Sequence, residues 1–147
     1  MQEPIQPFTP DVQAAFHQWI RRSEHTNRAR MSPEKHRILL MFLRTPDLKP
    51  RNRIEADIRT QLHGYRLDED PTSSILWRLR DSGHTDDRKV ILEDSVFHTI
   101  TGVHCHHAHP GKNKTFDLVR QRFYGITKVE VSKHGTQINI FYLFHWC

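Results

Sequence analysis

The chain has 147 residues, of which 36% are hydrophobic and 27% charged, and its net charge at pH 7 is +5. That length suits one domain or two very small ones, and the low apolar content points to a small core for which a metal ion is a usual supplement. No apolar run is long enough to span a membrane, and the start, MQEPIQPFTP, lacks the pattern of a signal peptide. Two cysteines are too few for a secreted disulfide scaffold, so we expect an intracellular protein. The basic balance favours polyanionic partners, nucleic acid first.

The first half of the chain reads as helical. Residues 1–10 hold three prolines and are expected to form a loose arm. In the third of the predicted helices, Ile54, Ile58 and Leu62 lie four residues apart and form one apolar stripe. We interpret residues 11–64 as a helical extension that packs as a small bundle. Apolar spacing, together with helix start and stop residues, predicts helices over 11–22, over 33–45 and after Pro50.

The hydrophobic period then changes from helical to alternating. A further helix begins at Asp94 or Ser95, and its inner face leads to His104, one turn beyond Ile100. The fold class predicted for the whole chain is mainly α with a small β ribbon, that is α+β, with residues 65–147 as a second module. The ribbon is predicted from three short β-branched or aromatic runs, which are Tyr65–Leu67, Ile75–Leu79 and Lys89–Leu92.

A cluster of histidines follows this helix, in the segment HCHHAH at residues 104–109. His104 at a helix end and His109 after a short turn have H-x4-H spacing, which lets two imidazoles reach one zinc ion. His106 and His107 compete for the place of the first ligand, although we expect them to be exposed. The alternative is a polar turn that is merely rich in histidine.

The remaining zinc ligands must come from elsewhere, because structural zinc takes four nitrogen or sulfur ligands. Cys147, the last residue, is the predicted third ligand. The fourth stays open among His145, Cys105, His134, a water molecule and the terminal carboxylate. A cysteine pair at this place would have its second member beyond residue 147.

The sequence around the two histidines resembles the zinc-binding N-terminal domain of retroviral and gypsy-type retrotransposon integrases, known as the HHCC or H2C2 domain. The similarity covers roughly residues 75–147, and the helices before it resemble the extension that often precedes this domain. It departs from the family pattern at residues 130–137, which hold a glycine and turn residues where the family has a helix. The residues that carry the resemblance are His104, His109, Gly111, Lys114, Thr115, Val119, Arg120, Phe123, Tyr124, Gly125, Ile126 and Cys147.

The resemblance implies one structural Zn²⁺ ion held by His104, His109 and Cys147, and a module that does not catalyse. In the family this domain contacts DNA and supports multimerisation, while a separate DDE core performs strand transfer, and no such core follows here. Domesticated relatives of the domain occur in DNA-binding regulators, which implies a nuclear location, with the cytoplasm as the alternative.

Basic residues near the predicted zinc site are the candidates for DNA contact. From residue 104 onward, six lysines and arginines stand against two acidic residues, a balance that favours phosphate. The residue types equally fit a solvated basic face. A runner-up function is a protein-interaction or homodimerisation module without nucleic acid, and a hydrolytic zinc enzyme is the weakest reading. No small-molecule substrate is expected. The predicted DNA-binding residues are Lys112, Lys114, Arg120, Arg122 and Lys128.

One more helix is predicted after the Pro-Gly turn. Phe116, Val119 and Phe123 follow each other at i, i+3 and i+7 and are expected to face the core.

Overall fold

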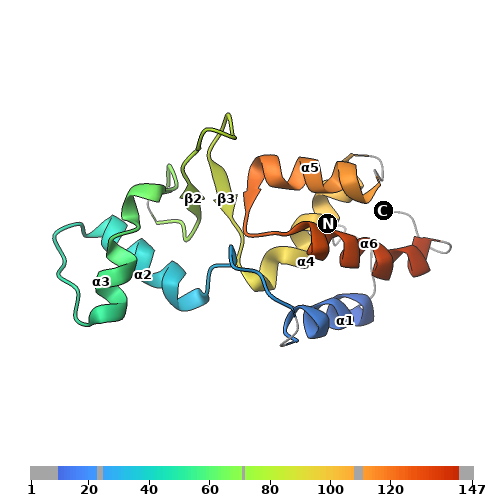
Figure 1. Cartoon of the computed structure of the whole chain (residues 1–147), viewed down its shortest axis with the longest axis horizontal. Coiled ribbons are helices and arrows are strands. Elements are labelled where there is room, and N and C mark those ends of the chain that lie inside the picture. Colours follow the sequence, from blue (N-terminus) through green and yellow to red (C-terminus); the bar gives the residue numbers. More distant parts are fainter. Residues whose placement is uncertain (1–9, 23–24, 71, 108–110, 143–147) are drawn as a thin grey trace, which may run out of the picture. The chain divides into compact units, whose positions relative to one another are not determined.

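The protein is α+β, as the sequence predicts. The structure, a computed structural model, describes residues 10–22, 25–70, 72–107 and 111–142, with side chains up to residue 137 (Figure 1). Within these residues no helix is both long enough and apolar enough to cross a bilayer. In chain order the elements are α1 (Pro10–Ile20), α2 (Pro33–Arg44), α3 (Arg53–Arg59), a 3₁₀ turn (Leu62–Gly64), β1 (Tyr65–Leu67), β2 (Leu76–Arg78), β3 (Arg88–Val90), α4 (Glu93–His106), α5 (Lys112–Arg122), β4 (Phe123–Tyr124) and α6 (Lys128–Tyr142).

The chain divides into two compact units. The helical unit comprises residues 1–28, 94–119 and 126–147, and the sheet unit comprises residues 29–93 and 120–125. The two units of the structure therefore divide the chain differently from the prediction, which placed one boundary between residues 64 and 65. That boundary separates sequence modules, so it stays a prediction.

The sheet unit is built on four short strands in the order β1-β2-β3-β4. The first three pair antiparallel, which confirms the predicted ribbon. The fourth strand was not predicted: Phe123 and Tyr124 pair parallel to β3, opposite Lys89 and Val90. The Ile91 N–H then donates to the Tyr124 carbonyl oxygen at 2.9 Å, which extends this pairing by one bond.

Helix α2 supplies the core of the sheet unit. It begins as predicted, because the Ser32 hydroxyl accepts a hydrogen bond from the Lys35 N–H at 3.1 Å and Pro33 occupies the first turn. Its apolar side chains Leu39 and Phe42 are fully buried, and the helix packs on α3 and β1.

The predicted stripe on α3 is wrong. Ile54 is 58% exposed, whereas Ile58 is buried. The helix has only seven residues and is capped at its C-terminus by Thr60, whose hydroxyl donates to the Asp57 carbonyl at 2.6 Å. Leu62 therefore lies in the separate 3₁₀ turn and not on the same helical face.

The helical unit collects α1, α4, most of α5, and α6 (Figure 1). Helix α1 confirms the first predicted helix and packs on α6. The predicted bundle over residues 11–64 stays a prediction. At the centre, Phe16 of α1 meets Phe97 of α4 at 5.5 Å between ring centroids. Ile100 and Val119 are also fully buried in this unit.

Helix α6 covers the segment where the sequence departs from the integrase pattern. It begins with a capping box, in which the Thr127 N–H donates to Glu130 Oε1 at 2.9 Å and the Glu130 N–H donates to Thr127 Oγ1 at 3.3 Å. The helix continues through Gly135, a residue that costs about 1 kcal/mol in a helix interior. The segment at 130–137 is thus helical despite its glycine and turn residues, which corrects the departure expected here from the sequence.

Candidate metal and nucleic-acid site

His104 lies at the end of α4 with its side chain in the interior of the helical unit. The helix buries Phe97, Ile100 and Val103 on the same side, and His104 itself is 8% exposed. The spacing of one and two turns from Ile100 and Phe97 predicts this orientation, which the structure confirms. His106 and His107 are exposed, as expected for histidines of a turn.

His134 of α6 shares this interior with His104. His134 is 1% exposed. Its ring shares a hydrogen bond of 2.9 Å with the Thr101 hydroxyl, and its centroid lies 4.9 Å from that of the Phe97 ring. Burial, and after it the positive charge that His104 can carry, lowers the pKa of His134 to about 3. His134 is therefore neutral at physiological pH, and a neutral imidazole is the form that binds a metal.

The remaining predicted zinc ligands fall in parts of the chain that the structure does not describe. His109 lies in 108–110, and Cys147, His145 and the terminal carboxylate lie in 143–147. Within the described residues, no group of three or more His, Cys, Asp or Glu side chains is arranged to hold a metal ion. The structure thus buries His104 and one of the proposed alternatives, His134, in the same unit.

Cys105 is the other cysteine of the sequence, and it is disulfide-bonded. Zinc is bound by the thiolate form of cysteine, so a cysteine in a disulfide is not a ligand. The imidazole pair fits zinc in its donor chemistry, but any thiolate contribution to the site requires the reduced chain.

Glu130 holds the helix that carries His134. Its carboxylate is fully buried and accepts hydrogen bonds from His25 Nε2 at 2.8 Å, from Asn27 Nδ2 at 2.9 Å and from the Thr127 N–H. Our sequence interpretation missed this role, although the spacing T-K-V-E at 127–130 is the signature of a capping box. The partners His25 and Asn27 lie more than 100 residues away in sequence, and no local signal predicts them.

The predicted DNA-binding residues are all exposed. Helix α5 carries four basic side chains against the single acid Asp117, so its exposed surface is positive. The predicted stripe on this helix is partly wrong: Val119 is fully buried, but Phe123 has left the helix for β4. Lys112, Lys114 and Lys128 belong to the helical unit, and Arg120 and Arg122 are grouped with the sheet unit.

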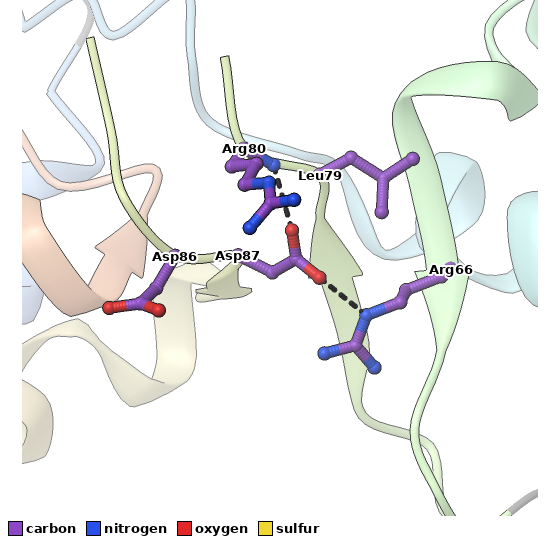
Figure 2. Close-up of a pocket in the computed structure, with 5 residues that line it drawn as sticks. All are labelled: Arg66, Leu79, Arg80, Asp86 and Asp87. Atoms are coloured by element: carbon purple, nitrogen blue, oxygen red, sulfur yellow. Dashed lines mark hydrogen bonds and ion pairs between the residues drawn. The ribbon is translucent and has the colours of Figure 1, made fainter. Parts of the chain in front are cut away.

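The sheet unit contains a hollow of about 630 Å³ whose charged lining residues pair with one another. Figure 2 shows Asp87 between two arginines: its carboxylate accepts from Arg66 Nε at 2.7 Å and from the Arg80 N–H at 2.8 Å. Both hydrogen bonds lower the pKa of Asp87, and the bond from Arg66 has the larger effect. Asp86 and Leu79 complete the lining. Asp87 therefore stays ionised and stabilises the end of the ribbon through these contacts with Arg66 and Arg80. It is not a candidate for a catalytic acid or base.

Comparison of the chain with protein-family models, with curated proteins and with solved structures finds no significant match.

Proposed function

We propose that the protein is a non-catalytic zinc-binding module that binds duplex DNA, as its resemblance to the integrase HHCC domain implies. The observation that carries the proposal is the burial of His104 beside His134 at the centre of the helical unit. Two buried imidazoles in a small core offer donor groups that suit a structural metal.

In this proposal, which concerns the chain with its disulfide reduced, His104, His109 and Cys147 hold one Zn²⁺ ion, and His134 is the fourth ligand or supports His104. When bound, zinc supplies folding free energy and no chemistry on a substrate. Thr101 and Phe97 fix the ring of His134, while Glu130 fixes the start of α6. The same residues then stabilise the helical unit and orient the imidazoles.

The exposed basic residues of α5 and the first residue of α6 provide the contacts with DNA. Each lysine or arginine that neutralises a phosphate releases counterions, which makes binding strongly dependent on salt. The proposal places the protein in the nucleus, where duplex DNA is available.

The test is a titration of fluorescently labelled duplex DNA at about 50 and 200 mM salt, which brackets the range where the effect is large. We expect the affinity to fall steeply with salt, and a Lys114→Gln/Arg120→Gln double variant to bind more weakly with a smaller salt slope. The matched control is Lys49→Gln, an exposed lysine that lies outside this surface. Failure to bind any DNA, with self-association that does not depend on salt, would favour the interaction module instead.

A further inference from the structure

A second basic feature of the helical unit is a pocket of about 510 Å³ between three helices. Trp19 of α1 and Val129 of α6 give it apolar walls. Lys112 opens α5, Lys128 opens α6, and Lys133 lies one turn further along α6, so three ammonium groups border one hollow. No acidic side chain is among its described lining residues.

The indole of Trp19 is the central feature of this pocket. Trp19 is partly exposed. The centroid of its ring lies 4.4 Å from that of the His25 ring, and Lys133 Nζ lies 5.8 Å from the centroid of the Trp19 ring. His25 is in turn held by the buried Glu130 carboxylate at 2.8 Å. The indole is thus packed against another ring while it also borders an open pocket, as a stacking platform requires.

Val129 adds an exposed apolar edge to the pocket. It is 60% exposed, the most exposed of the large hydrophobic side chains described. An exposed apolar side chain next to three lysines fits a ligand that is both planar and anionic. A membrane surface would need more exposed apolar side chains along the helices.

We propose that this pocket binds an unpaired nucleotide of a DNA strand, with the base stacked on Trp19 and the phosphates neutralised by Lys112, Lys128 and Lys133. The inference rests on the proposed function and refines it: duplex DNA binds the exposed α5 surface, and the pocket selects a frayed or single-stranded end. A base inside a duplex is stacked on both faces and cannot lie on the indole, whereas an unpaired base can. The volume lies in the range of small-ligand pockets.

The test compares three labelled DNAs of one sequence: a blunt duplex, the same duplex with a three-nucleotide overhang, and the single strand. Fluorescence anisotropy should show that the overhang and the single strand bind at least about fivefold more tightly than the blunt duplex, since stacking on an aromatic side chain contributes that much or more. Trp19→Leu should abolish this preference and Trp19→Phe should keep it. Lys133→Gln should weaken binding and reduce the salt slope by about one, whereas Lys49→Gln should do neither.

A cross-link tests the contact without any variant. Iodouracil in the overhang should, on irradiation, attach to the tryptic peptide that contains Trp19, and blunt DNA with iodouracil in its paired region should not. The inference is overturned if the wild-type protein binds the overhang and the blunt duplex equally, or if folded Trp19→Leu keeps the preference. Duplex binding that survives such a result leaves the proposed function standing, whereas absence of binding to all three DNAs overturns both.

Discussion

Replacement of Glu130 by alanine should destabilise the helical unit strongly. The carboxylate is fully buried and accepts three hydrogen bonds at 2.8–2.9 Å, from His25, Asn27 and the Thr127 N–H. Removal of the carboxylate leaves its buried hydrogen-bond donors without this acceptor, at a cost of about 1–3 kcal/mol for each, and it also removes a helix cap worth about 1 kcal/mol. We expect the free energy of unfolding to fall by about 3–5 kcal/mol in Glu130→Ala. Glu130→Gln keeps one acceptor oxygen and should cost less, about 1–3 kcal/mol.

The assay is urea unfolding followed by far-ultraviolet circular dichroism, with the slope m compared between variants. Glu34→Ala is the matched control, because Glu34 also lies in the first turn of a helix but is exposed. Its effect should be about 0.5 kcal/mol or less. A loss below about 1 kcal/mol in Glu130→Ala, at unchanged m, would refute the assignment of Glu130 as the buried anchor of α6.

Three further predictions concern other features. In metal-free protein, stability should fall by about 2 kcal/mol from pH 7.5 to pH 5, because unfolding lets His134 bind a proton below about pH 6.5 while burial keeps its pKa near 3 in the folded state. The urea midpoint should depend less on pH in His134→Gln than in the wild-type protein. An equal pH dependence in the two proteins would contradict the role given to His134. Gly125→Ala should destabilise by about 1–3 kcal/mol, since Gly125 has φ +108° and a Cβ there would lie 3.0 Å from the Ile91 carbonyl oxygen. Gly102→Ala, in an open helical position, should instead stabilise by up to about 1 kcal/mol in the same thermal or urea unfolding experiment, and equal effects at both sites would count against this reasoning. Zinc uptake followed with a chromogenic chelator should require reductant, and equal uptake by oxidised protein would exclude a thiolate ligand.

Local signals predicted most of the elements. The cap at Ser32, the apolar spacing of α1 and the alternating runs of the ribbon are properties of neighbouring residues, so they can be read without the fold. Strand β4 escaped prediction because two residues carry no period of their own, and Phe123 also fits the helical stripe before it. Only the pairing with β3, more than 30 residues earlier, decides between the two.

The candidate site was predictable in part for the same reason. The orientation of His104 follows from its place one turn after Ile100 on a single helix. Three contacts join segments that are distant in sequence: the hydrogen bond of His134 with Thr101 joins α6 to α4, the anchoring of Glu130 joins α6 to the loop that holds His25 and Asn27, and the contact of Lys133 with Trp19 joins α6 to α1. Such contacts depend on how α1, α4 and α6 pack, which the period of any one of them does not determine.

The central claim is that the interior of the helical unit around His104 holds zinc. The most direct measurement is the metal content, by elemental analysis, of reduced protein that has been purified without chelator. We predict about one zinc ion per chain in the wild-type protein and in His106→Ala, whose side chain is exposed, and loss of the zinc in His104→Ala. Folded wild-type protein without zinc, or zinc retained in His104→Ala, would contradict the account.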